Sequence, residues 1–174
     1  MLRKPLSIGI VALLAILTSV TASAQFKTIP IGELTDSIRL RPKPALILIS
    51  TNWCTYCAMQ KAQLKKSREF REAGSYLYYS EFDAETKQEL VFNGTTYRFA
   101  PTGTTTGSHE LAFTLGNINN RLSFPTWVLI NEHFEIVSRF PGVIKADDLA
   151  ALLENVRRHL PVKISDGAIQ KNLE

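Results

Sequence analysis

Residues 53–57 read Trp53-Cys54-Thr55-Tyr56-Cys57, and this stretch contains both cysteines of the 174-residue chain. It follows the continuous apolar run 45–49 and precedes a run of helix-forming residues that begins at Ala58. This order predicts a buried strand, a turn and a helix that starts at the cysteine pair. Unpaired N–H groups and the dipole at a helix N-terminus favour an anion, and the thiolate is the reactive form of cysteine. We therefore interpret Cys54 as the nucleophile and Cys57, one turn further on, as the resolving thiol.

Two alternatives for the cysteine pair are one half of a zinc site and an inert pair. A structural zinc site needs four ligands, commonly a second cysteine pair or a pair of histidines. The chain has no further cysteine, and His109, His133 and His159 are scattered singly. The spacing therefore favours redox chemistry over metal binding, and we expect no resident metal and no cofactor.

The first 24 residues have the pattern of a secretory signal peptide. Arg3 and Lys4 form a positive start, residues 6–20 are largely apolar, and Ala22-Ser23-Ala24 is a small-x-small cleavage pattern. The alternative is a retained membrane anchor, but the apolar run is shorter than the roughly 20 residues that span a bilayer. We expect cleavage after Ala24, a periplasmic or secreted protein, and no stable membrane insertion of the mature chain.

Composition fits one globular domain, with 45% hydrophobic and 21% charged residues. The net charge is +4, and because residues 1–24 contain two bases and no acid, the mature chain is near +2. This weak charge argues against nucleic acid as a partner. We expect the domain over residues 25–160 and a loose tail over residues 161–174.

Apolar periodicity and turn residues predict the elements. The expected helices cover residues 31–40, 58–72, 86–90, 109–115 and 147–160. The expected strands cover residues 45–50, 76–82, 122–130 and 134–140. Between the second and third strands, residues 91–99 predict a hairpin around Asn93-Gly94, residues 100–108 predict a loop, and Ser108 is a candidate cap of the next helix.

This order of elements resembles the thioredoxin family over roughly residues 30–160. The features that carry the resemblance are the Trp-Cys-x-x-Cys motif after a buried strand, Phe124-Pro125-Thr126 at the start of a later strand, and a terminal strand pair with Gly142 before a closing helix. It implies an α/β thioredoxin fold, with a central mixed β-sheet flanked by helices and an inserted hairpin and loop around residues 91–108. Within the family, the chain looks most like exported, periplasmic thioredoxin-like thiol–disulfide oxidoreductases.

The resemblance also implies that Pro125 is cis and faces the cysteine pair. In this family the backbone beside that proline pairs with an extended substrate segment. Trp53, Phe124, Pro125 and Thr126 are then the expected substrate-binding residues, with Trp53 covering one side of the site. The alternatives are a core position for Trp53 and an ordinary trans proline in an edge strand for Pro125.

The sequence departs from the family at a buried acid. Thioredoxins keep an acid in the strand before the motif and a lysine on the next strand, and these positions fall at Leu48 and near Tyr79. The candidates to replace the acid are Glu81, Asp83, His109 and Glu110. The alternative for His109 and Glu110 is a solvent-exposed helix start.

The second departure is Thr55-Tyr56, which replaces the Gly-Pro of cytosolic thioredoxin and makes both residues possible modulators of the thiols. Tyr56 supplies no positive charge to stabilise a thiolate, which favours a reductase over a strong oxidant. We therefore predict that the protein reduces or isomerises disulfides of other exported proteins, with electrons from a membrane or exported donor. The alternatives are a thiol oxidase, and a non-catalytic module that binds a peptide, or copper through the cysteines and Met59 or His109.

Overall fold

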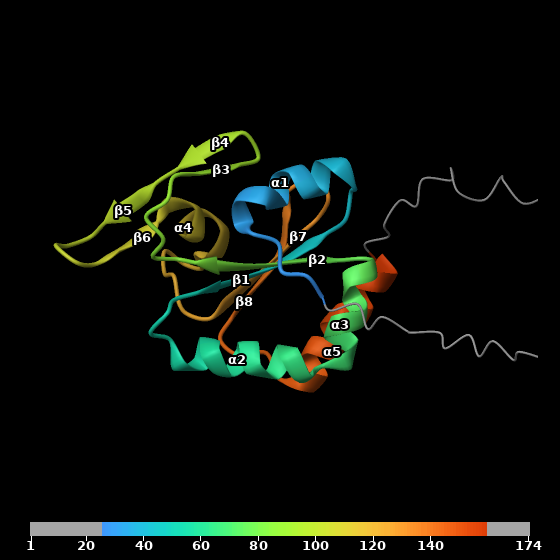
Figure 1. The fold of residues 1–174 in the computed structure, drawn as a ribbon. Helices are drawn as coiled ribbons and strands as arrows, with labels where there is room; N and C mark the ends of the chain where they lie inside the picture. Colours follow the sequence, from blue (N-terminus) through green and yellow to red (C-terminus); the bar gives the residue numbers. More distant parts are fainter. Residues whose placement is uncertain (1–25, 160–174) are drawn as a thin grey trace, which may run out of the picture.

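The computed structural model describes residues 26–159 (Figure 1). The signal peptide that we predict over residues 1–24 and the tail over residues 161–174 lie outside the described residues. Within residues 26–159, no helix combines the length and the apolar character that crossing a membrane requires.

Helices and short strands alternate along the described chain. The helices are α1 (Ile31–Leu40), α2 (Thr55–Lys66), α3 (Arg68–Glu72), the 3-10 turn η1 (Ala73–Ser75), α4 (Glu110–Gly116) and α5 (Ala146–His159). The strands are β1 (Ala45–Ser50), β2 (Tyr78–Asp83), β3 (Leu90–Phe92), β4 (Thr95–Tyr97), β5 (Phe99–Pro101), β6 (Gly107–His109), β7 (Thr126–Ile130) and β8 (Ile136–Pro141).

The central sheet has the strand order β2-β1-β7-β8. Strand β1 is parallel to β2 and antiparallel to β7, which is antiparallel to β8. Helices α1 and α4 cover one face of this sheet, and α2, α3 and α5 cover the other (Figure 1). The predicted fold class, a mixed sheet flanked by helices, is confirmed.

Strand β1 is buried along its whole length because it lies between two hydrophobic cores. Its alternate residues Ala45, Ile47 and Ile49 pack with α1 and α4. Leu46 and Leu48 point the other way and pack with α2, α3 and α5. A strand covered on both faces needs a continuous apolar sequence, which is the pattern of residues 45–49.

The helix of the cysteine motif starts at the cysteine pair, as predicted, but it is shorter than predicted. It begins at Thr55, with Cys54 as its N-cap. It breaks at Ser67, where the predicted helix that runs to residue 72 becomes α2 and α3. The Ser67 hydroxyl accepts a hydrogen bond from the Phe70 N–H at 3.1 Å and so starts α3 as a separate helix.

The inserted segment is more ordered than the sequence indicated. The hairpin around Asn93-Gly94 forms as β3 and β4, and both turn residues have positive φ. Residues 100–108, predicted as a loop, contribute to a second hairpin of β5 and β6. Gly107 permits this pairing, because a Cβ there would lie 2.5 Å from the Phe99 ring and 2.6 Å from the Ala100 carbonyl oxygen.

The helix predicted over residues 86–90 is wrong. Residues 86–89 are an irregular turn, and Leu90 already belongs to β3. Local side-chain bonds compete with a helix here, since the Thr86 hydroxyl accepts from the Gln88 N–H at 3.4 Å. The Gln88 carbonyl is in turn bonded by the ring of His109, on the returning strand of the insertion.

Candidate active site

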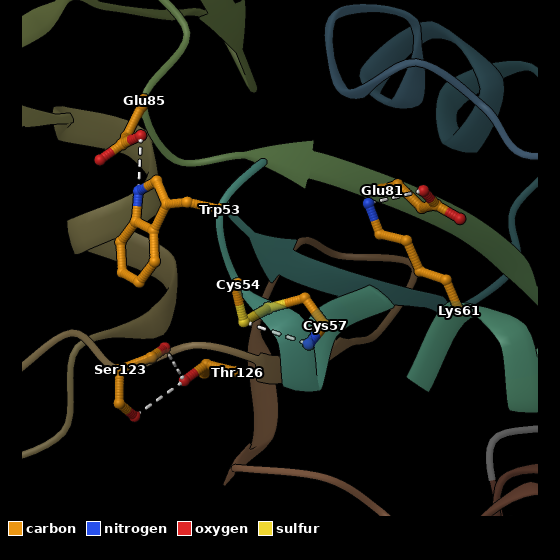
Figure 2. The surroundings of a disulfide bond; sticks show 8 residues. All are labelled: Trp53, Cys54, Cys57, Lys61, Glu81, Glu85, Ser123 and Thr126. Carbon is orange, nitrogen blue, oxygen red and sulfur yellow. Dashed lines mark hydrogen bonds and ion pairs between the residues drawn. A yellow bond between two sulfur atoms is a disulfide. The ribbon is translucent and has the colours of Figure 1, made fainter. Parts of the chain in front are cut away.

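Cys54 and Cys57 form a disulfide at the N-terminus of α2, with their Cα atoms 5.2 Å apart (Figure 2). The Cys57 N–H donates to the Cys54 sulfur at 3.1 Å, so this sulfur occupies the cap position of the helix. Cys54 is 7% exposed and Cys57 is 1% exposed. The outer sulfur is therefore the one that a substrate can reach first.

The chain places this pair at the carboxyl end of the central strand. After β1 ends at Ser50, a turn brings the Cys54 N–H to 3.3 Å from the Thr51 carbonyl oxygen. The Ser50 carbonyl is bonded by the Ala84 N–H, which follows β2. The cysteines thus start α2 from the end of a strand that is fixed on both sides by its neighbours.

A loop before β7 lies beside the disulfide. The Phe124–Pro125 peptide bond is cis, the geometry that the family resemblance implies. Ser123 and Thr126 of this loop lie next to Cys54 in Figure 2. The Pro125 carbonyl accepts from the Gly142 N–H at 2.7 Å, whereas the backbone N–H and C=O of Phe124 have no hydrogen-bond partner among residues 26–159. The free backbone beside the cysteines therefore belongs to Phe124.

The Thr126 side chain stabilises the loop to which it belongs. It is fully buried, and its hydroxyl donates to the Ser123 carbonyl oxygen at 2.7 Å. On the other side, Thr126 pairs with Ile49 of β1. The side chain of Thr126 thus fixes the loop against β1 rather than reaching outward.

Trp53 lies on the surface and not in the core, with 67% of the residue exposed. Its indole Nε1 donates to the Glu85 carboxylate at 3.0 Å (Figure 2). Its ring meets the ring of Phe124 edge-on, with centroids 6.0 Å apart. Thr55 and Tyr56, the residues between the cysteines, are also exposed. The site therefore presents an aromatic surface beside the disulfide.

A carboxylate lies on β2 opposite the position of the missing acid. Glu81 pairs in register with Leu48, and its carboxylate binds Lys61 of α2 at 3.0 Å. Its other oxygen accepts from the Tyr79 hydroxyl at 3.1 Å. Burial, and then the neighbouring charge of Glu81, raise the pKa of the Tyr79 phenol above its ordinary value. Glu81 is thus a half-buried acid whose two carboxylate oxygens are both engaged, and Figure 2 shows it in the surroundings of the cysteine pair.

His109 and Glu110 are bonded within the insertion. His109 is fully buried and, in place of Ser108, caps α4 by accepting the Leu111 N–H at Nδ1. Its Nε2 lies 3.0 Å from the Gln88 carbonyl oxygen, so both ring nitrogens are engaged. Glu110 is exposed and accepts from the Arg98 N–H. The alternative of an exposed helix start therefore holds for Glu110 and not for His109.

Sequence reasoning missed Glu85, the partner of Trp53. It lies two residues after β2, outside the cysteine motif and outside the predicted helices and strands. Asp83, considered as a replacement acid, accepts from the Asn52 side chain at 3.1 Å and from the Glu85 N–H at 3.0 Å. The Asn52–Asp83 and Trp53–Glu85 contacts depend on the pairing of β1 with β2, which no local pattern reveals. Among residues 26–159, no group of three or more His, Cys, Asp or Glu side chains is placed to hold a metal ion.

The fold and the cysteine pair define the class of the protein: it is a thiol–disulfide oxidoreductase of the thioredoxin type. Residues 33–157 match the family described as the thioredoxin-like domain, and the chain belongs to that family.

Several solved structures are similar to this chain. A mutant thioredoxin from Halobacterium salinarum NRC-1 is 18% identical, with a TM-score of 0.53 over 79% of this chain and 97% of that one. A thioredoxin-fold protein from Helicobacter pylori is 21% identical, with a TM-score of 0.49 over 77% and 76% of the two chains. The oxidoreductase DsbH is 18% identical, with a TM-score of 0.49 over 81% and 91%. Among curated proteins, none matches this sequence significantly.

Proposed function

We propose that the protein is exported and that it reduces or isomerises disulfides of other exported proteins. The proposal of export rests on the N-terminal sequence, with a signal peptide over residues 1–24 that is cleaved after Ala24. The mature protein is then one domain over residues 25–160 followed by a short tail. Its partners are exported proteins with disulfides, and a membrane or exported dithiol protein that returns electrons to it.

The observation that carries the proposed chemistry is the placement of Cys54. Its sulfur is the outer one of the pair and lies at the N-terminus of α2, beside the loop of Ser123 and Thr126 (Figure 2), in which the backbone of Phe124 has no hydrogen-bond partner among residues 26–159. An extended substrate segment can pair with that backbone by strand addition and bring its own disulfide to Cys54. Trp53, Phe124, Pro125 and Thr126 are the proposed substrate-binding region, in which Trp53 and Phe124 supply the aromatic surface.

The proposed exchange has two steps. The Cys54 thiolate attacks one sulfur of the substrate disulfide, which breaks that bond, forms a mixed disulfide and releases a substrate thiolate that takes up a proton. Cys57 then loses its proton to solvent and attacks the Cys54 sulfur, releasing the second substrate thiol. The substrate gains two electrons and two protons, and the protein is left with the Cys54–Cys57 disulfide, the form in this structure.

Charge near the pair supports the reducing direction. The charged side chains in Figure 2 are Lys61, Glu81 and Glu85, and Lys61 is paired with Glu81. The remaining charge is negative and disfavours the thiolate form of the cysteines. Strong oxidants of this class instead stabilise their reduced, thiolate form. We therefore propose Thr55, Tyr56 and Glu85 as the groups that keep the pair reducing.

Trapping of mixed disulfides tests this function. In the Cys57→Ala variant, the first step proceeds and the second cannot, so covalent adducts with exported proteins should accumulate and dissolve on addition of dithiothreitol. The control is the Cys54→Ala/Cys57→Ala double variant, which should form none. Equal adducts in both, or adducts only with Cys54→Ala, would overturn the assignment of Cys54 as the nucleophile.

A further inference from the structure

We propose that Asp83 and Glu85 form an acidic corner that selects disulfide-bearing segments with a basic residue beside the cysteine. This inference rests on the proposed function, because it assigns a substrate class to the same site. It adds a specificity role to two residues at the end of β2, neither of which belongs to the cysteine motif.

The acidic corner holds both residues that precede the nucleophile. Asp83 accepts from the Asn52 side-chain amide at 3.1 Å, and Glu85 accepts from the Trp53 indole at 3.0 Å. The Asp83 carboxylate also accepts from the backbone N–H of Glu85 at 3.0 Å, which joins the two acids. Figure 2 shows the Glu85 carboxylate directly beside the indole of Trp53. A substrate that contacts Trp53 therefore meets the acidic corner.

The negative charge of the acidic corner is not neutralised by these bonds. The donors from Asn52 and Trp53 are a neutral amide and a neutral indole. Three cations make other contacts: Lys61 with Glu81 at 3.0 Å, Arg98 with Glu89 at 2.7 Å, and Lys87 over the Phe99 ring at 5.8 Å. The second Glu85 oxygen has no hydrogen-bond partner among residues 26–159. An incoming guanidinium or ammonium group would thus find a free acceptor.

The acidic corner is fixed in place before a substrate arrives. Between its two acids, the Ala84 N–H donates to the Ser50 carbonyl at 2.8 Å, and the Ala84 carbonyl accepts from the His109 N–H at 2.7 Å. These bonds tie it to the end of β1 and to the returning strand of the insertion. The hairpin of β5 and β6 projects from this end of the sheet, where α2 also begins (Figure 1). A preorganised acceptor gives selectivity without an ordering cost on binding.

Two disulfide-bridged peptides test the proposal. They are identical except that one carries arginine and the other glutamate next to the reactive cysteine. The reduced protein should reduce the arginine peptide roughly tenfold faster at low ionic strength, and the ratio should fall toward one in high salt because exposed charges are screened. Neutral hydroxyethyl disulfide serves as the reference substrate for the thiol chemistry itself.

Conservative variants separate charge from positioning. Glu85→Gln keeps an oxygen acceptor for the Trp53 indole and removes the charge, so the peptide preference should shrink. The rate with each peptide is divided by the hydroxyethyl disulfide rate of the same variant, which corrects for any change in the reactivity of the thiols themselves. Asp83→Asn/Glu85→Gln should abolish the preference. Glu33→Gln, at an exposed position on α1, is the matched control and should leave it intact.

The outcomes distinguish this inference from the proposed function. Equal rates for the two peptides in the unaltered protein, or a preference that survives in Asp83→Asn/Glu85→Gln, would overturn the acidic corner as a specificity element. Failure of the reduced protein to reduce either peptide and hydroxyethyl disulfide would instead overturn the reductase function. A preference equally lost in Glu33→Gln would assign the effect to overall charge and also contradict the proposal.

Discussion

Gln60 is a buried polar residue of α2 whose side chain holds the loop before α5 against that helix. It is fully buried, and its side chain accepts from the Ile144 N–H at 2.7 Å and donates to the Ile144 carbonyl at 3.2 Å. Gln60→Ala leaves both backbone groups without this partner, so we expect a loss of about 2–3 kcal/mol in the free energy of unfolding. Urea unfolding measures this loss.

Gln63 offers the control for this prediction, since it donates to the same Ile144 carbonyl at 3.2 Å but is only part-buried. Gln63→Ala should cost less than about 1 kcal/mol, because Gln60 still satisfies both groups. Equal losses for the two variants would show that Gln60 does not hold the loop.

Sequence motifs identified the residues that carry the chemistry, but not the residues that hold them and their neighbouring elements in place. Cys54, Cys57 and Pro125 could be singled out because their spacing and order carry meaning within the chain. Gln60, Glu85 and the cap formed by His109 could not, since each depends on a partner more than twenty residues away or on a turn that the sequence did not predict. Periodicity describes the faces of an element, whereas these residues act between elements.

Among the elements, the hairpin of β5 and β6 depends on Gly107. A methyl group there would collide with the Phe99 ring and the Ala100 carbonyl, so Gly107→Ala should open this pairing. We expect amide hydrogen exchange to speed up in residues 99–109 and to stay slow in β7. Gly94→Ala is the comparison, because a Cβ at Gly94 meets no atom within 4 Å and only its φ of +80° disfavours alanine. Protection of residues 99–109 that survives Gly107→Ala would contradict this account.

The end of α5 gives a prediction for pH. Hydrogen bonds from Arg157 and Arg158 lower the pKa of Glu154 to about 2. A lowered carboxyl pKa stabilises the folded state above the ordinary carboxyl range, and this contribution disappears as the pH falls toward 2. Because the group is exposed, the effect on stability should be small. A carbon-detected NMR titration should find the pKa of Glu154 at about 2, and a pKa in the ordinary carboxyl range would contradict the pairing.

Elements were predictable in proportion to their length and burial. Strand β1 and helices α1 and α5 have apolar patterns that continue over many residues, and their positions were predicted within one residue at each end. Strands β5 and β6 have three residues each, which is too short for an alternation of apolar and polar residues to be recognised in the sequence. The break at Ser67 was missed because a serine inside a helical pattern shows its role as a cap only when its hydroxyl meets the next turn.

For the whole molecule, the residues just after the expected cleavage site belong to the fold. Ile29 donates its N–H to the Tyr79 carbonyl at 2.8 Å, and Thr28 forms a parallel bridge with Tyr79. The Phe26 ring packs on Phe70 with centroids 4.7 Å apart. A chain that starts at Pro30 should therefore be about 2 kcal/mol less stable than one that starts at Gln25, because it loses the partly buried Phe26 ring.

Thermal unfolding of the two chains measures this difference, and a third chain that starts at Phe26 is the control. The Phe26 chain should unfold at nearly the same temperature as the Gln25 chain. If the chain starting at Pro30 matched both, the segment 26–29 would not be part of the stable domain.

The central claim is that the Cys54–Cys57 pair transfers electrons to substrates rather than taking them. Equilibration of the purified protein against dithiothreitol buffers at pH 7, read out by alkylation of the free thiols, gives the reduction potential of the pair. Negative charge near the cysteines and the neutral Thr55-Tyr56 dipeptide predict a value at or below about −230 mV, toward the range of thioredoxin. A value above about −150 mV, toward the strongly oxidising members of the class, would make the protein a disulfide donor and contradict the account.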